Sequence, residues 1–189
     1  ERPTHSAVRL RFLSGALLVF DDTRRFGSME ALTSAEWNER SNQMGPEPLG
    51  STYQVSHLLD GLQRSSSPIR SWLLDQKRIA GVGNIYANEA LYLADIHPQR
   101  QSRSVTRNEA KALYRSLRSV LRDAIKAGGT TIQDYRNTDG DKGEYAGQLS
   151  VYGREGKPCY RCNSGVQRIV FSNRSAFYCP SCQPRRRNK

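Results

Sequence analysis

The chain has 189 residues, 37% of them hydrophobic, and carries a formal net charge of +11 with an isoelectric point near 9.9. It contains no apolar run long enough to cross a membrane and no segment typical of a secretory signal. These features exclude membrane-spanning proteins and small secreted disulfide scaffolds, and they predict a cytoplasmic, nucleoid-associated protein, or a nuclear one in a eukaryote. The basic surplus favours a polyanionic partner, most simply nucleic acid, although a generally basic surface would give the same charge.

The first predicted element is a β-hairpin at residues 8–20. Apolar residues alternate from Val8 to Phe12, Ser14 and Gly15 form a turn, and an apolar run at residues 17–20 forms the return strand. A lone hairpin is marginally stable in water, and the sequence nearby supplies no further strand to cover its apolar face. We therefore interpret the hairpin as the edge of a larger β-domain.

From residue 33 the hydrophobic period becomes helical. Capping boxes at residues 33–36 and 106–109 open a short helix that carries Trp37 and a long amphipathic helix. Further helices are predicted at residues 55–62, 69–73 and 87–94. The glycines at 128 and 129 end the long helix, and the polar residues 130–148 predict a mobile loop.

Four cysteines, the only ones in the chain, form two Cys-x-x-Cys knuckles near the C-terminus: Cys159, Cys162, Cys179 and Cys182. This spacing is typical of a closed structural site that holds one zinc ion with four thiolates. The alternative is a pair of disulfides, which suits a short secreted domain better than this chain. The sequence therefore predicts one structural zinc ion and no catalytic metal.

The segment between the knuckles predicts a second hairpin. Two apolar runs, at residues 166–171 and 175–178, flank a polar turn with Arg174 at its tip. A basic tail, residues 185–189, follows the second knuckle. The zinc site would therefore support an exposed arginine on a basic surface.

A glycine turn at residues 81–83 separates two predicted helices. Free backbone N–H groups and the helix dipole favour an anion at such a helix N-terminus, and Asn84 could add a side-chain donor. The alternative, which is the better interpretation of this motif alone, is a helix connection with Asn84 as a plain cap. A dinucleotide fingerprint is rejected because the full glycine pattern and the preceding strand are missing.

Several segments together resemble the formamidopyrimidine-DNA glycosylase family. The resemblance is carried by residues 75–91, 96–98, 128–131 and 151–159 with the four-cysteine hairpin after them. Residues 22–27 are similar to the family's Asp-Pro-Arg-Arg-Phe-Gly loop, with Thr23 in place of the proline. The similarity runs from about Val8 to Gln183 in the family's order.

This resemblance implies an α+β multidomain fold. Residues 1–32 would be the remnant of an N-terminal β-sandwich, residues 33–148 a mainly helical helix–two-turn–helix domain, and residues 149–189 a four-cysteine zinc finger with a basic tail. Family members remove oxidised purines such as 8-oxoguanine in base excision repair by flipping the base out of the duplex, and then cleave the backbone. The implied partner is double-stranded DNA that contains an oxidised purine or an abasic site, bound by a monomer.

The resemblance also implies roles for individual residues. Asn84 and Arg174 would clamp phosphates beside the flipped nucleotide. Arg24 would face the orphaned base, and Phe26 would wedge between base pairs. A loop at residues 138–145 would close over the extruded base. Weaker candidates for backbone contact are Tyr152 and Lys77.

The family's chemistry depends on an N-terminal proline, followed by a glutamate, whose secondary amine attacks the sugar. This chain begins at Glu1, and Pro3 is internal, so its nitrogen is an amide. We therefore expect the chain as given to lack Schiff-base glycosylase and lyase activity, either as a fragment of an enzyme or as a natural non-catalytic paralogue. His5, His57 and His97 have no catalytic partner and are interpreted as surface or packing residues.

A different class of protein stays open. Only the positive charge and the two knuckles support an RNA- or ribosome-associated zinc module. The motifs at residues 24–26 and at Asn84 argue against that class, because they belong to the DNA glycosylase pattern.

Overall fold

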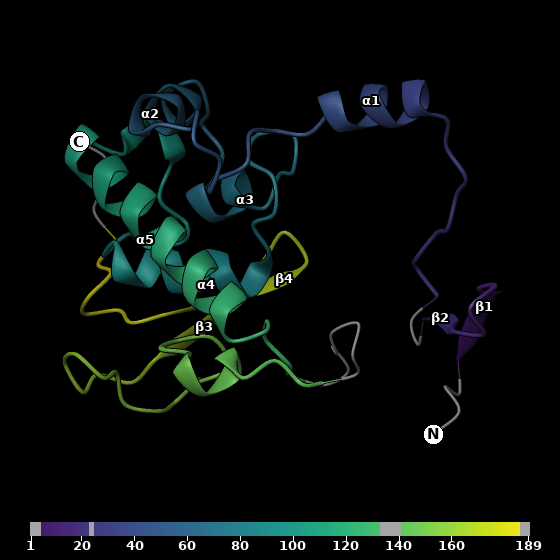
Figure 1. Cartoon of the computed structure of the whole chain (residues 1–189). Helices are drawn as coiled ribbons and strands as arrows, with labels where there is room; N and C mark the ends of the chain where they lie inside the picture. The colour runs from purple at the N-terminus through teal and green to yellow at the C-terminus, as the bar shows by residue number, and fades with distance from the viewer. Residues whose placement is uncertain (1–4, 23–24, 133–140, 186–189) are drawn as a thin grey trace. The chain divides into compact units, whose positions relative to one another are not determined.

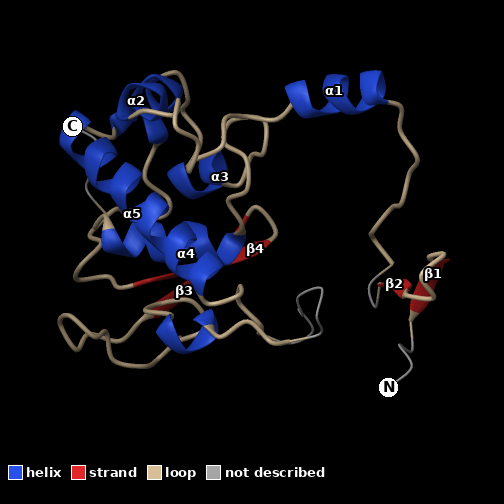
Figure 2. Ribbon diagram, in the orientation of Figure 1, coloured by secondary structure: helices blue, strands red, loops and turns tan. Residues whose placement is uncertain are grey.

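The computed structural model of the chain describes residues 5–22, 25–132 and 141–185 (Figure 1). Contacts divide the chain into two compact units, Glu1–Ser41 and Asn42–Lys189, and each is described by itself. The mixture of helices with two small sheets confirms the predicted α+β class (Figure 2). The predicted domain boundaries after residues 32 and 148 stay a prediction.

The first unit contains the predicted hairpin and the first capping-box helix. Strand β1, Ser6–Arg11, pairs antiparallel with strand β2, Leu17–Asp21, and helix α1 spans Ser34–Asn42. The hairpin exposes a row of large apolar side chains, namely Leu10, Phe12, Leu13, Leu17 and Leu18. The uncovered apolar face expected from the sequence is therefore present.

The second unit is built around four helices. They are α2, Val55–Gln63; α3, Ile69–Leu73; α4, Asn84–Leu93; and α5, Arg107–Lys126. Helix α4 lies against α5, and α2 packs on the same long helix (Figure 2). The core is apolar and fully buried at positions such as Leu58, Ile69, Leu91, Leu113 and Leu117. Within the described residues, no helix combines the length and the apolar character needed to cross a bilayer.

Helix α4 begins at Asn84, three residues earlier than predicted. Gly81 adopts the left-handed conformation with φ +74°, which favours glycine, and this residue turns the chain out of the preceding segment. Gly83 is then extended and serves as the N-cap, so the helix starts at the next residue.

The zinc-finger hairpin consists of β3, Gln167–Phe171, and β4, Arg174–Tyr178, paired antiparallel. Ser172 and Asn173 form its turn, with φ values of 52° and 55°. Both central residues of a type I′ turn have positive φ, and this turn matches the twist of the strands. Arg174 is therefore the first residue of β4 and not the tip of the turn.

The segment after α5 is more ordered than the sequence suggests. Thr130 bridges to Glu144, and Tyr145–Gln148 form a 3₁₀ helix in which the Tyr145 ring is buried edge-on against Tyr86. The prediction of one mobile loop over residues 130–148 is therefore wrong for its end at residues 141–148. Residues 133–140, and with them the first part of the predicted base-covering loop, lie outside the described residues.

Candidate nucleic-acid interface and zinc site

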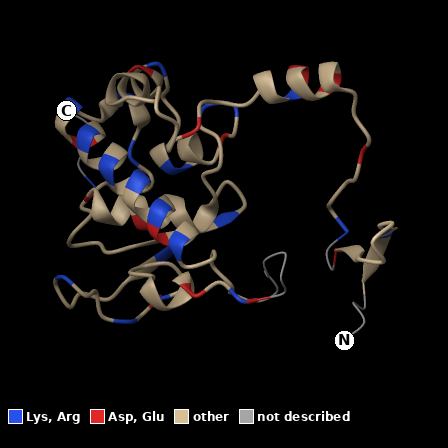
Figure 3. Cartoon of the chain, viewed as in Figure 1, with Lys and Arg blue, Asp and Glu red and all other residues tan. Residues whose placement is uncertain are grey.

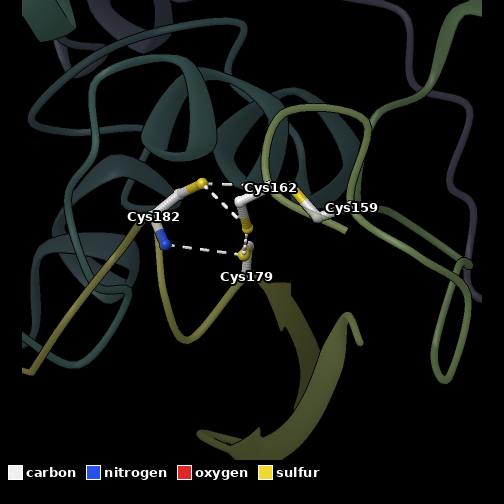
Figure 4. Close-up of side chains that lie close together, drawn as sticks. All are labelled: Cys159, Cys162, Cys179 and Cys182. Atoms are coloured by element: carbon white, nitrogen blue, oxygen red, sulfur yellow. Dashed lines mark hydrogen bonds between the residues drawn. The ribbon is translucent and has the colours of Figure 1, made fainter. Parts of the chain in front are cut away.

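The four cysteine sulfurs converge on one point (Figure 4). All four lie within 4.8 Å of one another, and neighbouring pairs, such as Cys162 with Cys179, approach to 3.4 Å. Sulfurs at about 2.3 Å from a zinc ion in a tetrahedron are about 3.8 Å apart, whereas a disulfide bond is about 2.05 Å long. The geometry fits the predicted zinc site and not the disulfide alternative.

The cysteine thiols of this site differ in their ionisation. Burial opposes ionisation of Cys159, but a hydrogen bond from the Tyr92 hydroxyl and backbone N–H donors outweigh it and lower the pKa of this thiol. Burial and hydrogen bonds with the neighbouring sulfurs raise the pKa of Cys182. Four thiolates in one site repel one another, and a divalent zinc ion removes that repulsion.

Helix α4 attaches the finger to the helical unit along one face. The buried carboxylate of Glu89 accepts three backbone hydrogen bonds, from the N–H groups of Ser150, Val151 and Tyr152, at 2.8, 3.0 and 2.8 Å. One position earlier, the side chain of Asn88 accepts from the Phe177 N–H of β4 at 2.8 Å. These bonds fix the finger, and with it β4, against α4.

The N-terminal end of the same face carries the candidate site. Arg70 on α3 donates from Nε and Nη2 to Asn84 Oδ1, at 3.2 and 2.7 Å. Its Nη2 also donates to the Ser175 carbonyl at 2.8 Å, and Asn84 Nδ2 donates to the same carbonyl at 3.2 Å. The predicted residue Asn84 is thereby joined to Ser175, the immediate neighbour of the predicted residue Arg174.

Arg70 is a fully buried cation in this cluster. Its guanidinium lies 4.8 Å from the centre of the Phe171 ring, and its Nη1 is buried with no hydrogen-bond partner among the described residues. Burial, together with the charge of Arg174, lowers the pKa of Arg70 to about 10. In the part of the chain that the structure describes, no carboxylate pairs with either arginine. The site therefore holds excess positive charge.

The start of α4 adds uncompensated N–H groups to this charge. No side chain caps the helix, and the first backbone bond inside it runs from Ala87 N–H to the Gly83 carbonyl. No atom lies within 4 Å of the position that a side chain would take at Gly83, so the space beside this N-cap is open. Free N–H groups, the helix dipole and two arginines together suit an anion such as a phosphate.

The other predicted residues of this unit differ in their placement. The Tyr152 ring packs edge-on against Phe177, at 5.0 Å between ring centres, and lies in the neighbourhood of Arg70. Lys77 is exposed in the turn before Gly81, and no recorded contact among the described residues joins its side chain to Asn84. The structure brings Asn84, Arg174 and Tyr152 together and leaves Lys77 at the periphery.

The loop after β2 belongs to the first unit. The Asp22 carboxylate accepts from the N–H groups of Arg25 and Gly27, at 2.9 and 2.6 Å, which fixes this turn. Phe26 between them is 83% exposed, a large apolar side chain held at the surface. Its wedge role stays a prediction. Arg24, predicted to face the orphaned base, lies outside the described residues.

Sequence reasoning missed Arg70, Asn88 and Glu89. Arg70 lies in α3 among the apolar residues Ile69, Trp72 and Leu73, and a charge at this position was the available signal. Asn88 follows Asn84 by one helical turn, and this spacing puts both amides on one face. His97, interpreted as a packing residue, is buried edge-on against Tyr178.

Comparison with known families identifies two matching segments. Residues 44–136 match the formamidopyrimidine-DNA glycosylase H2TH domain, and residues 156–185 match the zinc finger found in FPG and IleRS. The first segment contains α2 to α5 with Arg70 and Asn84, and the second contains all four cysteines. The matches therefore cover both halves of the candidate site.

Whole-chain relatives give the same result. The chain is 45% identical over 183 residues to a formamidopyrimidine-DNA glycosylase of Dinoroseobacter shibae, covering 95% of this chain and 64% of the relative. For the Thermus thermophilus protein the identity is 42% over 185 residues, covering 96% and 69%. The chain thus spans about two thirds of the length of these relatives.

Solved structures agree with both comparisons. The crystal structure of the Fpg protein from Thermus thermophilus superposes with a TM-score of 0.90 at 42% identity, covering 97% of this chain and 70% of that one. A complex of Lactococcus lactis Fpg with DNA containing an abasic site has a TM-score of 0.90 at 32% identity, covering 98% and 68%.

Proposed function

The chain belongs to the formamidopyrimidine-DNA glycosylase family, and we propose that it binds the phosphate backbone of damaged double-stranded DNA in base excision repair. The binding site is the cluster of Arg70, Asn84, Ser175 and Arg174 at the start of α4. The damage is an oxidised purine or an abasic site. Relatives with this fold have been solved with DNA containing an abasic site and with DNA containing Fapy-dG, which supports this choice of ligand.

One observation carries the proposal. Arg70 and Arg174 place two positive charges beside an uncapped helix N-terminus, and no carboxylate among the described residues compensates them. A buried guanidinium without a counter-ion is costly, so a bound phosphate would lower the free energy of this site. Arg174 and Asn84 would contact the phosphate, and the buried Arg70 would position Asn84 and add positive charge.

The zinc finger has a supporting role in this proposal. The four cysteines fix the β3–β4 hairpin, in which Arg174 is the first residue of β4. Asn88 fixes this hairpin to α4, and Glu89 fixes residues 150–152, at the start of the finger, to the same helix. Zinc neutralises the thiolates and closes the finger, and no substrate needs to reach it. The metal therefore sets the position of one arginine relative to Asn84.

Binding and chemistry are separate parts of the proposal. The family's nucleophile is an N-terminal proline amine, which these residues do not display, whereas the phosphate-binding cluster lies within them. We expect the 189-residue polypeptide to bind DNA containing an abasic site without forming a Schiff base. Borohydride trapping on such a duplex tests this, and a covalent adduct would refute it.

Binding is tested by fluorescence anisotropy with a duplex that contains an abasic-site analogue. Arg174→Ala should weaken binding about tenfold or more, because a charge-assisted contact to phosphate is lost. Arg161→Ala is the matched control, since Arg161 lies in the same finger but is paired with Asp95 at 2.6 Å, and no hydrogen bond among the described residues joins it to the cluster. Equal losses of DNA affinity in the two variants would mean that only net charge matters, and the proposed binding site would be wrong.

A further inference from the structure

Helix α5 carries a second concentration of positive charge, separate from the cluster at α4. Its basic residues recur every three or four positions and are visible as repeated bands along the helix (Figure 3). They are Arg107, Lys111, Arg115, Arg118, Arg122 and Lys126. At about 100° per residue, all of them fall within an arc of about 100°, opposite the buried apolar face. We name these six residues the α5 stripe.

Acidic residues do not balance the α5 stripe. The helix contains Glu109 and Asp123 only. Glu109 belongs to the capping box with Thr106 and to an ion pair with Arg100, so its charge is already compensated. Asp123 lies at the edge of the stripe and accepts a hydrogen bond from the Ser119 hydroxyl at 3.2 Å. Lys111, Arg115 and Arg122 are exposed and have no ion pair among the described residues.

The middle of the stripe is shaped as well as charged. A surface hollow of about 310 Å³ is lined by Tyr114, Arg115, Arg118, Ser119, Arg122 and Asp123. Arg118 is held in place, because its Nη1 donates to the Pro48 carbonyl and its guanidinium lies 5.3 Å from the centre of the Tyr114 ring. The other two arginines, Arg115 and Arg122, are exposed to solvent. Three guanidinium groups around one hollow suit a phosphate group.

The chemistry of the stripe favours nucleic acid over an acidic protein. Ile125 is the one large exposed apolar side chain on α5 within the described residues. Protein interfaces have an apolar or aromatic centre that is poor in charge, and the stripe has none. The stripe extends about 28 Å, at 1.5 Å per residue, which corresponds to about 8 base pairs of duplex. Its charges could therefore follow a phosphate backbone along the whole helix.

We propose that the α5 stripe binds the phosphate backbone of a second segment of double-stranded DNA, without reading its sequence. The stripe lies on the side of α5 opposite its buried residues, and α5 packs against α4, the helix that begins with Asn84. The stripe is therefore a second site in addition to the proposed phosphate-binding cluster at the start of α4, which we name the lesion site. A chain with two such sites could hold two stretches of duplex at once.

A bridging experiment tests this. The zinc-loaded chain is bound to an immobilised duplex that contains an abasic-site analogue, and an intact 12-base-pair duplex is then passed over it. We expect the second duplex to be captured at 50 mM salt. Lys111→Gln/Arg115→Gln/Arg122→Gln should weaken this capture at least tenfold and change the first binding step less than twofold. Glutamine is a good helix former, so α5 should persist, which circular dichroism verifies.

Salt dependence gives a second readout. Each phosphate contact contributes about −0.9 to the slope of log affinity against log salt, so three lost contacts should reduce the slope by about 2.7. Two controls accompany the triple variant. Arg64→Gln/Arg103→Gln/Lys157→Gln removes the same charge from exposed positions elsewhere and should retain capture. Lys111→Arg/Arg115→Lys/Arg122→Lys keeps the charge on the stripe and should also retain it.

Three results would overturn the proposal. One is unchanged capture by the triple glutamine variant. Another is an equal loss in the scattered-charge control, which would reduce the effect to net charge. The third is tighter capture of a polyglutamate peptide than of duplex through the same residues, which would assign the stripe to an acidic protein. Because Arg174→Ala affects only the lesion site, direct binding of duplex to that variant tests the stripe even if the first site fails.

Discussion

Arg70 and Asn84 come from separate helices and are joined by two hydrogen bonds to one oxygen, Oδ1 of Asn84. This contact orients the amide so that its Nδ2 reaches the Ser175 carbonyl of the finger. A buried guanidinium thus connects α3, α4 and β4 at the point where the phosphate would bind. Arg70 is a positioning residue for the two residues that the sequence had indicated.

Arg70→Met should weaken DNA binding while it changes the stability of the fold little. Arg70 forms three hydrogen bonds but no ion pair among the described residues, and its two acceptors keep other donors, Asn88 Nδ2 and Asn84 Nδ2. Removal of the buried charge offsets the lost bonds, so the free energy of unfolding should change by about 1 kcal/mol or less. DNA affinity should fall about tenfold, because Asn84 loses its orientation and the site loses charge. Urea denaturation and fluorescence anisotropy measure the two effects.

Arg100→Met is the control for this prediction. Arg100 is also largely buried but forms an ion pair with Glu109. Its loss should destabilise the fold by about 3 kcal/mol, because Glu109 is left without its partner, while DNA affinity stays unchanged. Wild-type affinity in Arg70→Met would show that Arg70 has no role in the phosphate site.

Removal of zinc should unfold the finger and leave the helices. Cys159 and Cys179 belong to a small buried cluster with Val151 and Val166, whereas most of the main core is formed by the helices. Cys162→Ser, or chelation, should therefore abolish the β3–β4 amide signals in an NMR spectrum and retain those of α5. Ser164→Ala changes the same knuckle without removing a ligand and should keep its zinc. A finger that stays folded after complete loss of metal would contradict a structural site.

Glu89→Ala should be among the most destabilising substitutions in the chain. It removes a buried carboxylate that accepts three backbone N–H groups and leaves those donors unsatisfied. We expect the free energy of unfolding to fall by about 4 kcal/mol. Asp60→Ala, on the exposed face of α2, is the control and should change it by about 0.5 kcal/mol or less. Similar effects in the two variants would contradict the role of Glu89.

His97 should make stability depend on pH. Burial, assisted by the charge of Arg185, lowers the pKa of His97 to about 4, and its neutral Nδ1 accepts from the Gln99 N–H. The unfolded chain binds a proton near pH 6.5 and the folded chain does not, so stability is full above pH 6.5 and falls as pH drops towards 4.

The loss between pH 7 and pH 5 should be about 2 kcal/mol. Denaturation at the two pH values measures it, with His97→Gln as the comparison because glutamine does not titrate. The variant should lose less stability than the wild type over this interval. An equal fall in both proteins would show that His97 is not responsible.

The local features of this fold could be predicted from the sequence. Both capping-box helices begin where their Thr and Glu residues predict, because the stabilising contacts span three residues. The zinc knuckles and both hairpins are local in the same sense. Asn84 and Arg174 were indicated by resemblance, and the structure brings them to one cluster without testing their roles.

The missed features depend on contacts between distant parts of the chain. Arg70 and Ser175 are 105 residues apart, and Glu89 is 61 to 63 residues from the N–H groups that it binds. No periodicity in the sequence shows that these charges are buried, because burial is decided by the tertiary structure. The end of the predicted loop, at Tyr145, was missed for the same reason, since its ring is buried against Tyr86.

Side chains of α4 hold the finger at several points, which include Ser175, Phe177, residues 150–152 and Cys159. A rigid helix sets the distances between these points, so the finger segments that connect them must keep their lengths. Apart from the zinc ligands and the buried residues, side chains between the points make none of these attachments, but an inserted or deleted residue would move one attachment relative to the others. We therefore expect the finger to tolerate changes of side chain at such positions better than changes of segment length.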